Sequence, residues 1–411
     1  MKSVCQIVQN VYDVDSRVRR KVDALVAAGY SVDVFALRAP QGEKTYTLDG
    51  ATIHTIALGK MRGSLFRYAY EYVVFFLWAF LKVSLLMRRR RYAVIDVNTL
   101  PDFLIFAGIV ARWMGAKLVL DMHEITAEFY MSKYEIPPDS WKVRLLNFQE
   151  RISFNFADYV ITINEPIQEL LVSRGMDAKK SIVLMNAADE ARFAPRRGLQ
   201  KSAPQSDVQP NSFVMMYHGT LTRIYGLEIA VESFSKVHTQ MPSAELCILG
   251  GGPERKILAD LAQEHGIGEK VKLIGQVPSS EIPGWLSKCD VGILPIRRDV
   301  FLDFAFPNKL PEFIISGKAV LMSRLKAIRH YFSEDALAYF EPNNADDLAK
   351  QMVRLYQNKA LCAKMAAQAK KEYEPIRWDV MKQRYLVLIN QIAGIQSDGS
   401  QTPQASAMVG A

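Results

Sequence analysis

The segment Pro307-Asn308-Lys309-Leu310-Pro311-Glu312 brings a cation and a carboxylate together at a spacing that supports binding chemistry. Residues three apart share one face of a helix, so Lys309 and Glu312 are expected to lie side by side. A lysine there neutralises phosphate, and a carboxylate accepts hydrogen bonds from hydroxyl groups. An isolated K-x-x-E is more often a surface salt bridge, so this interpretation needs support from the rest of the chain.

Three glycine-containing turns follow apolar runs upstream of this segment. They are His218-Gly219-Thr220-Leu221, Gly250-Gly251-Gly252-Pro253 and Gly275-Gln276-Val277-Pro278. Glycine at a strand end lets a ligand approach the backbone, and the N-terminus of a following helix binds anions. Arg223, shortly after the first turn, would add a bidentate phosphate contact. Each turn alone is equally well explained as a tight connection between elements.

The elements that must position these residues alternate between short apolar runs and amphipathic stretches. Strands are predicted at 4–8, 32–37, 53–56, 93–97, 117–120, 159–163, 181–184, 213–217, 245–249, 271–274, 291–294 and 319–322. Helical patterns such as 17–28 and 104–114 lie between them, each followed by a glycine. Such alternation predicts an α/β fold with parallel sheets covered by helices.

A composition break divides the chain into two such units. Residues 195–212 are rich in Pro, Ser, Gln and Lys and predict a linker. We expect a first domain at 1–194, a second at 213–375, a helix at 376–394 that crosses back to the first domain, and a disordered tail at 395–411. Two doubly wound, Rossmann-like domains present the carboxyl ends of their strands to a central cleft.

Residues 64–91 form a long apolar stretch that ends in four arginines. Glu71 and Lys82 interrupt it, which disfavours a membrane span. The two remaining interpretations are a core helix whose terminal arginines favour the helix dipole and a basic helix that docks on anionic lipid. Both hold together if one side is buried and the other faces water.

Composition narrows the classes of protein further. The four cysteines are far apart and lack C-x-x-C spacing, which disfavours a zinc site and a disulfide scaffold and indicates a reducing cytoplasm. The first residues predict a strand and not a signal peptide. The net charge of +8 suits phosphate-bearing ligands or an anionic membrane. Nucleic-acid binding is disfavoured, because no basic pattern interleaved with aromatic residues appears.

The order of these motifs resembles the family 4 glycosyltransferases with the GT-B fold. The succession runs HGTL, GGGP, GxVP, CDVGILP, PNKLPEF and SGKAVL in the second half. In the first half, Asp15-Ser16-Arg17-Val18 and Asp121-Met122-His123-Glu124 resemble the family's opening and its later strand-end motif. Trp378 fits the closing segment, so the resemblance covers roughly residues 3–392.

The resemblance implies a hexosyl-type transfer from a nucleoside diphosphate-sugar, UDP favoured over GDP, with retention of configuration and without a metal or other cofactor. The second domain holds the donor and the first holds a glycan or lipid-linked acceptor. It implies catalytic roles for His123, Glu124 and Asp303. The implied donor-binding residues are Arg17, Gly219, Thr220, Arg223, Gly251, Gly252, Val277, Asn308, Lys309, Leu310 and Glu312. Glu312 would grip the ribose and Lys309 the diphosphate.

Three positions depart from the family pattern. The first glutamate of its E-x7-E motif is replaced by Phe304, which leaves Asp303 as the nearest carboxylate. Where the family usually has an arginine and a lysine near the first glycine turn, this chain has Thr220 and Tyr225. We therefore weigh two functions, an active transferase in bacterial surface polysaccharide or glycolipid assembly and an inactive GT-B scaffold that partners one. The first is expected in the cytoplasm, with attachment to the inner face of the membrane through 64–91 as the open alternative.

Overall fold

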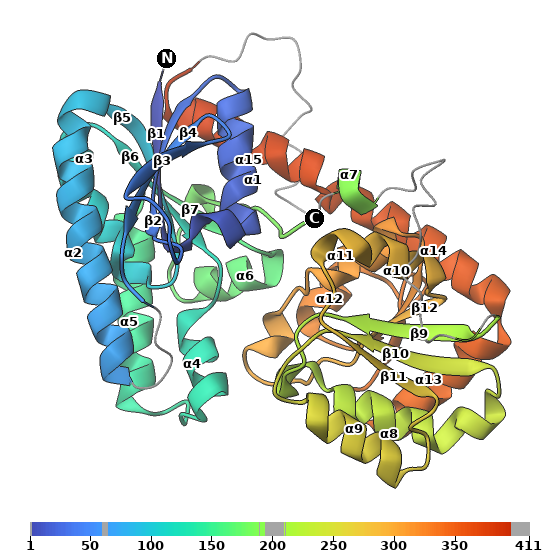
Figure 1. The fold of residues 1–411 in the computed structure, drawn as a ribbon. Helices are drawn as coiled ribbons and strands as arrows, with labels where there is room; N and C mark the ends of the chain where they lie inside the picture. The colour runs from blue at the N-terminus through green and yellow to red at the C-terminus, as the bar shows by residue number, and fades with distance from the viewer. Residues whose placement is uncertain (1, 60–64, 189, 194–208, 210, 396–411) are drawn as a thin grey trace.

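The computed structural model describes residues 2–59, 65–188, 190–193, 209 and 211–395. They form two α/β domains, each built on one sheet, as the alternation of elements predicts (Figure 1). The tail at 396–411 and nearly all of the expected linker at 195–212 lie outside the described residues.

The first domain contains an eight-stranded sheet in the order β3-β4-β2-β1-β5-β6-β7-β8. Its strands are β1 (Ser3–Val11), β2 (Ser31–Leu37), β3 (Thr45–Leu48), β4 (Ala51–Ile56), β5 (Tyr92–Asn98), β6 (Lys117–Met122), β7 (Tyr159–Thr162) and β8 (Ser181–Val183). Its helices are α1 (Ser16–Ala27), α2 (Leu65–Arg90), α3 (Ile109–Trp113), α4 (Thr126–Tyr134), α5 (Trp141–Phe156), α6 (Glu165–Ser173) and α7 (Glu190–Phe193). Only β3 runs antiparallel to its neighbour among the described strands.

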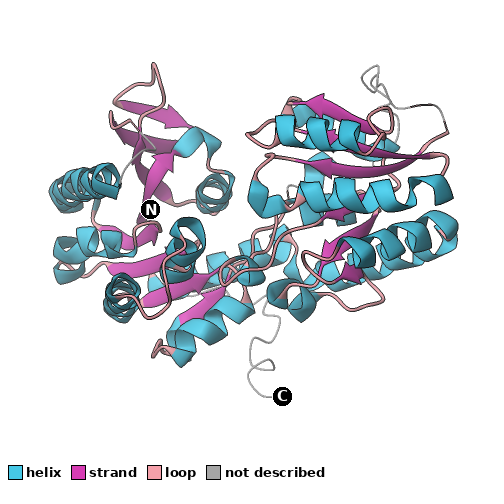
Figure 2. Cartoon of the chain, turned by 90° about the horizontal axis from the view of Figure 1, so that it is seen from below, coloured by secondary structure: helices cyan, strands magenta, loops and turns pink. Residues whose placement is uncertain are grey.

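The second domain contains a six-stranded parallel sheet in the order β11-β10-β9-β12-β13-β14. Its strands are β9 (Phe213–His218), β10 (Ala244–Leu249), β11 (Val271–Gly275), β12 (Val291–Leu294), β13 (Ala319–Ser323) and β14 (Ala338–Phe340). Its helices are α8 (Leu227–Val237), α9 (Arg255–Glu264), α10 (Ile282–Lys288), α11 (Lys309–Ile315), α12 (Lys326–Tyr331), α13 (Ala345–Gln357) and α14 (Lys359–Tyr373). Figure 2 shows helices on both sides of each sheet.

Local chemistry explains the boundaries that position the site. The carboxylate of Asp15 caps α1 by accepting the Val18 amide at 3.1 Å, and Gly29 ends that helix with a φ of 84°. The central strands are buried on both faces, as is typical of parallel sheets, and Cys5 and Cys247 lie inside them as small apolar residues.

One predicted helix winds differently. Its first half, Asp102–Gly108, is a 3-10 helix, and α3 continues from Ile109. Gly108 weakens the α-helical pattern at that point. A Cβ there would also stand 2.6 Å from Leu118, so the glycine is needed for close packing on β6.

A last helix, α15 (Trp378–Ile392), leaves the second domain and packs on the first. Its Tyr385 hydroxyl donates a hydrogen bond to Asp96 at 2.7 Å, and its Asn390 accepts one from the Tyr30 hydroxyl at 2.5 Å. Figure 1 shows this helix against the blue elements of the first domain. The chain thus returns to the domain where it began.

The two domains also touch at the carboxyl ends of their strands. Ser132 of α4 donates to Asp299 at 2.6 Å, and Asn164, after β7, donates to the carbonyl of Phe304 at 2.9 Å. The Phe129 and Phe301 rings meet edge to face at 5.4 Å. The loops that carry the sequence motifs therefore lie on the sides of the sheets that face each other.

Candidate functional site

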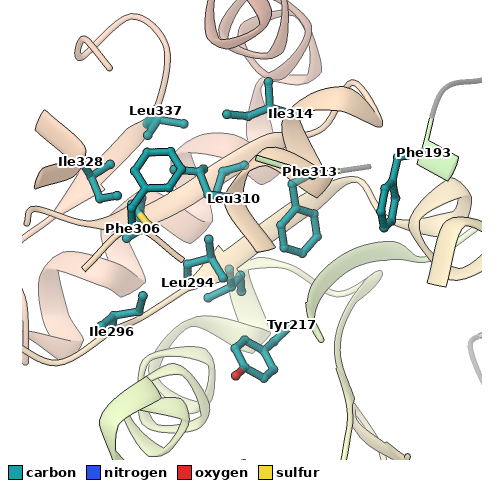
Figure 3. Close-up of a cluster of buried hydrophobic side chains, with 14 of the residues drawn as sticks. Phe193, Tyr217, Leu294, Ile296, Phe306, Leu310, Phe313, Ile314, Ile328 and Leu337 are labelled. Atoms are coloured by element: carbon teal, nitrogen blue, oxygen red, sulfur yellow. The ribbon is translucent and has the colours of Figure 1, made fainter. Parts of the chain in front are cut away.

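The helix α11, which carries Lys309 and Glu312, is fixed in place by its apolar side. Leu310, Phe313 and Ile314 are fully buried, and Figure 3 shows them directed into a cluster with Leu294 of β12 and Phe306. Lys309 and Glu312 lie where this helix meets the end of β9. The Leu310 side chain has a packing role, and its contact with a donor stays a prediction.

Lys309 lies in a cradle of two tyrosines. Its ammonium sits 4.2 Å from the centre of the Tyr225 ring and 5.5 Å from that of Tyr217. Aromatic faces attract a cation, but they do not replace its water. Burial lowers the pKa of Lys309 to about 8, although the charge of Glu312 opposes this shift. The site therefore holds a lysine whose charge a bound anion would stabilise.

Glycines make room for this lysine and for the loops beside it. Gly219 has a φ of 130°, and a Cβ there would stand 2.0 Å from the Lys309 Cε. The carbonyl oxygen of Gly219 would lie 1.8 Å from a Cβ at Gly250, and that of Leu221 would lie 2.2 Å from one at Gly252. The turns after β9 and β10 are thus packed backbone against backbone. Gly251 has no such constraint.

Glu312 faces a histidine from the adjacent strand. The His218 Nε2 lies 3.4 Å from the Glu312 carboxylate, and the imidazole packs on the Phe313 ring at 5.0 Å. His218 is 5% exposed at the end of β9. The imidazole thus lies beside the carboxylate that the sequence analysis assigns to a hydroxyl-binding role.

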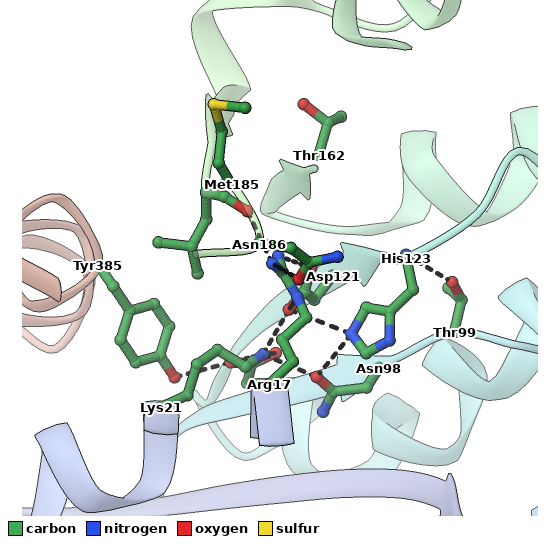
Figure 4. Close-up of polar contacts among 12 residues, drawn as sticks. Arg17, Lys21, Asn98, Thr99, Asp121, His123, Thr162, Met185, Asn186 and Tyr385 are labelled. Atoms are coloured by element: carbon green, nitrogen blue, oxygen red, sulfur yellow. Dashed lines mark hydrogen bonds and ion pairs between the residues drawn. The ribbon is translucent and has the colours of Figure 1, made fainter. Parts of the chain in front are cut away.

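The first domain contributes a buried charge cluster of Arg17, Lys21, Asp96 and Asp121 (Figure 4). Arg17 donates two hydrogen bonds to Asp121, at 2.7 and 3.1 Å. Lys21 donates to Asp121 at 2.6 Å and to Asp96 at 3.0 Å. Burial opposes ionisation of Asp121, yet Arg17, Lys21 and His123 hold its pKa well below its usual range. The cluster is charged and internally paired.

This cluster positions His123 at the end of β6. The His123 Nε2 lies 3.4 Å from the Asp121 carboxylate and 3.3 Å from the Asn98 side-chain oxygen. Two acceptors at one nitrogen favour the tautomer that carries its proton there. The backbone amide of His123 donates to the Thr99 hydroxyl at 3.0 Å. The ring is thus held at the edge that faces the second domain.

Glu124 is the next residue and is poised to titrate near neutrality. Burial raises its pKa to about 7, with Lys133 partly opposing the shift, and its Oε2 has no hydrogen-bond partner. Burial also raises the pKa of Tyr225, and the charge of Glu124 raises it further. Glu124 of the first domain and Tyr225 of the second therefore lie within electrostatic reach of one another. Perturbed carboxyls of this kind are common at functional sites.

Several other predicted residues lie apart from Lys309 and Glu312. Arg17 is occupied by Asp121, by Asn186 at 3.0 Å and by the Leu184 carbonyl at 2.7 Å. Asp303 accepts the backbone N–H of Lys326 at 2.9 Å and lines a different hollow. Arg223 is solvent-exposed in a 3-10 turn. These positions stay predictions as ligand contacts.

The remaining predicted residues lie in the motif loops. The carbonyl of Thr220 accepts the Tyr217 hydroxyl at 2.8 Å, while Asn308 directly precedes α11 and is exposed. Val277 follows β11 and packs partly buried against the core. One local expectation is wrong: α8 begins only at Leu227, so the HGTL turn does not itself form that helix's N-terminus.

Sequence reasoning missed three side chains of the site. His218 stood inside the HGTL motif without a role, and Tyr217 preceded it as an ordinary strand residue. Tyr225 was noted only as a departure from the expected lysine. Neither the spacing nor the residue type of the two tyrosines predicts a contact with a lysine, because Tyr217, Tyr225 and Lys309 meet only in the folded domain. Among the described residues, no group of His, Cys, Asp and Glu has the geometry of a metal site.

Family comparisons match both halves of the chain. The family described as "Glycosyl transferase 4-like domain" matches residues 14–187, and "Glycosyl transferases group 1" matches residues 200–372. The chain belongs to the family 4 glycosyltransferases with the GT-B fold. The family and fold expected from the motif order are confirmed.

Curated relatives are distant. A D-inositol 3-phosphate glycosyltransferase of Corynebacterium urealyticum is 24% identical over 85% of this chain and 90% of its own length. The putative colanic acid biosynthesis glycosyltransferase WcaL of Escherichia coli is 26% identical over 50% of this chain and 49% of that protein. A phosphatidylinositol N-acetylglucosaminyltransferase component of Arabidopsis thaliana is 22% identical over 65% and 55%. This glycosyltransferase spans about half the length of the last two relatives.

Solved structures share the fold. Sucrose-phosphate synthase from Thermosynechococcus elongatus superposes with a TM-score of 0.75 at 18% identity, covering 96% of this chain and all of that one. Alr3699/HepE of Anabaena, solved in complex with UDP, gives a TM-score of 0.67 at 14% identity, with 95% and 100% covered. At these identities the likeness establishes the GT-B architecture of the glycosyltransferase.

Proposed function

We propose that this glycosyltransferase moves a hexosyl group from a nucleoside diphosphate-sugar, preferably a UDP-sugar, to a glycan or lipid-linked acceptor in bacterial surface polysaccharide or glycolipid assembly. The transfer retains the anomeric configuration and proceeds without a metal. The observation that carries the proposal is the Lys309 cradle, where a partly desolvated cation lies beside Glu312 and the glycine turns. The solved complex of the similar HepE fold with UDP supports the choice of nucleotide.

The proposed chemistry uses the site as follows. Breaking the bond between the sugar and the diphosphate develops negative charge on the leaving group, and Lys309 with nearby backbone N–H groups would meet it. Glu312, which lies beside His218, would accept hydrogen bonds from the ribose hydroxyls. His123 and Glu124 would lie on the acceptor side of the sugar, at the edge of the first domain. Asp303 stays a candidate for the sugar end of the donor.

The first test combines donor binding with transfer. Thermal shift with UDP-, GDP- and dTDP-sugars should show stabilisation by UDP-sugars, because a ligand of the native state stabilises it by mass action. Lys309→Ala and Glu312→Ala should each lower turnover at least tenfold, about 1.4 kcal/mol of transition-state stabilisation. NMR of the product would report the anomeric configuration.

A matched control removes a lysine elsewhere in the same domain. The Lys256 side chain is 85% exposed on α9, so Lys256→Ala should leave turnover within twofold. Wild-type turnover in both site variants would remove the site assignment. Absence of binding to every nucleotide-sugar would favour the alternative of an inactive scaffold.

A second part of the proposal concerns the membrane. Helix α2 is long and apolar enough to cross one by length and composition, over Ala69–Arg90. It lies instead along the first domain, with Phe75, Ala79 and Val83 fully buried on the sheet. Its opposite side is exposed and apolar. The two interpretations of this helix, core packing and an interfacial face, therefore describe its two sides.

The apolar exposure continues onto neighbouring helices. The 3-10 segment Asp102–Gly108 packs between α2 and α5, through Phe103 on Phe76 and Phe106 on Phe156. We call the exposed large apolar side chains of this layer the outer face. It consists of Tyr70, Val73, Leu77, Leu81, Leu85, Trp113, Met114, Trp141, Leu145, Phe148 and Ile152. Figure 1 shows α2, α3 and α5 on the side of the first domain turned away from the second.

The charged residues of α2 and α5 indicate which kind of partner suits the outer face. The acidic residues of α2 and α5 are Glu71 and Glu150, and both are buried. The exposed charges of these helices are basic: Lys82, Arg88, Arg89, Arg90, Lys142, Arg144 and Arg151. An exposed apolar face on helices whose exposed charges are basic matches an anionic bilayer, to which each nearby cation adds about 1 kcal/mol. We propose that the enzyme docks there on the cytoplasmic face of the cell membrane.

Vesicle sedimentation tests this docking. The wild type should bind vesicles rich in phosphatidylglycerol and not phosphatidylcholine vesicles, and salt should weaken the binding. Leu81→Glu with Trp141→Glu should reduce bound protein at least fivefold. Ile257→Glu, at a site 51% exposed on α9, supplies the control. A wild-type dimer that these two changes dissociate would instead assign the outer face to a protein contact.

A further inference from the structure

A second ligand site is suggested by a basic hollow where the domains meet. The hollow has a volume of about 400 Å³ and is lined by Pro166, Arg298, Asp303, Arg324, Lys326, Arg329 and His330. Pro166 belongs to α6 of the first domain, and the other residues belong to the second. Figure 1 shows α6 and α12 at the junction of the domains. The hollow is therefore built by both domains.

Two of its arginines are held in position by glutamates that do not line it. Arg324 pairs with Glu334 and lies 2.9 Å from Glu341, which also lies 3.7 Å from Arg298. Arg298 donates to the carbonyl of Arg324, so the two guanidinium groups are kept side by side. These ion pairs partly compensate Arg298 and Arg324, so the exposed Lys326 and Arg329 supply the charge that would attract an anion.

Asp303 organises the opposite wall. Its carboxylate lies 3.4 Å from the Arg298 Nε and accepts the backbone N–H of Lys326, while the Lys326 ammonium lies 5.0 Å from the centre of the Phe304 ring. Lys326 and Arg329 are solvent-exposed, so their charges are accessible to a ligand. One lining carboxylate faces four lining cations and a histidine.

The lining residues distinguish this hollow from the part of the donor site around Lys309. None of its lining residues belongs to the cradle of Lys309. The two are nevertheless close in sequence, because the connection from β12 to α11 contains Asp303 and ends at Lys309. We propose that the basic hollow binds the phosphate or diphosphate group of the acceptor. This inference rests on the proposed transfer reaction, because only a transferase needs an acceptor beside its donor.

Inorganic pyrophosphate is the probe for the test, titrated by calorimetry in the presence of saturating UDP. Lys326→Ala with Arg329→Ala should weaken pyrophosphate binding at least tenfold. Lys350→Ala with Arg354→Ala removes the same charge from exposed positions of α13 and should change it less than twofold. The thermal stabilisation by UDP should be equal in both, which separates this site from the donor site. All four side chains are exposed, so folding should be retained.

Unchanged binding in the Lys326/Arg329 variant, or no pyrophosphate binding by the wild type, would overturn the proposal. If UDP itself fails to bind, the same titration on Lys309→Ala isolates the hollow from the donor site. Competition by farnesyl diphosphate in detergent would identify a lipid-linked source, and competition by glucose 1-phosphate a soluble one. Pyrophosphate binding that neither compound displaces would contradict the acceptor assignment.

Discussion

Lys309 is the residue whose protonation should govern donor binding. Its pKa is lowered to about 8 by burial, and a diphosphate bound beside it would favour the charged form. UDP binding should therefore be nearly independent of pH below about 8, take up a proton above it, and weaken by up to roughly tenfold per pH unit there. Calorimetry in buffers of different ionisation enthalpy measures both the affinity and the proton uptake.

The control for this pH dependence is a variant without the titrating group. Lys309→Met should bind UDP weakly at every pH and without the step near pH 8, whereas Lys256→Met should keep the step. The sign for folding is opposite to the usual lysine case. Because the folded pKa lies below the unfolded one, the cost of burying the charged lysine is fully present below pH 8 and fades above it. A step retained in Lys309→Met would assign it to another group.

At the scale of elements, the glycine turns decide where Lys309 can lie. Gly219→Ala would place a Cβ 2.0 Å from the Lys309 Cε at a φ of 130°. The lysine must then leave its cradle, so UDP affinity should fall at least tenfold and stability by about 1–3 kcal/mol. Affinity from calorimetry and the free energy of unfolding from urea titration check the two effects.

Gly284→Ala provides the comparison within the same domain. Gly284 lies in α10, and nothing stands within 4 Å of a Cβ there. Alanine should leave UDP affinity unchanged and raise the free energy of unfolding by up to about 1 kcal/mol. If both variants bound UDP like the wild type, the turn after β9 would not be part of the donor site.

At the scale of the whole molecule, α15 ties the end of the chain to the charge cluster of the first domain. The Tyr385 hydroxyl donates to Asp96 and accepts from Gln6 at 2.8 Å, and Lys21 lies 5.5 Å from the centre of its ring. Tyr385→Phe would remove one hydrogen bond each from Asp96 and Gln6, which stay bonded to one another at 2.9 Å, so the free energy of unfolding should fall by about 0.5–1.5 kcal/mol.

The same cluster orients His123, so the effect should reach the reaction. Tyr385→Phe should lower kcat more than donor affinity, because the cluster belongs to the first domain. Val387→Ala, on the same helix at a site 60% exposed, should change stability by less than about 0.5 kcal/mol. Equal urea midpoints for the two variants would show that α15 is merely attached to the surface.

The sequence by itself determined the architecture and the place of α11. Apolar periodicity, caps and glycine turns are local properties, so they predicted twelve strands of the two sheets and the domain in which each motif lies. The short edge strands β3 and β14 were missed, since few residues carry their pattern. The motif order was sufficient to identify the family.

Only the tertiary structure decided which side chains meet. The Lys309 cradle joins β9, the turn before α8 and α11, and the hollow that contains Asp303 joins both domains. Arg17 is a partner of Asp121 because the carboxyl end of β6 lies beside the start of α1 in the folded domain. The outer face also depends on the tertiary structure, because packing on the sheet decides which side of each helix is buried and which is exposed. Such contacts depend on the sheet order and on long-range packing, which residue type and spacing do not encode.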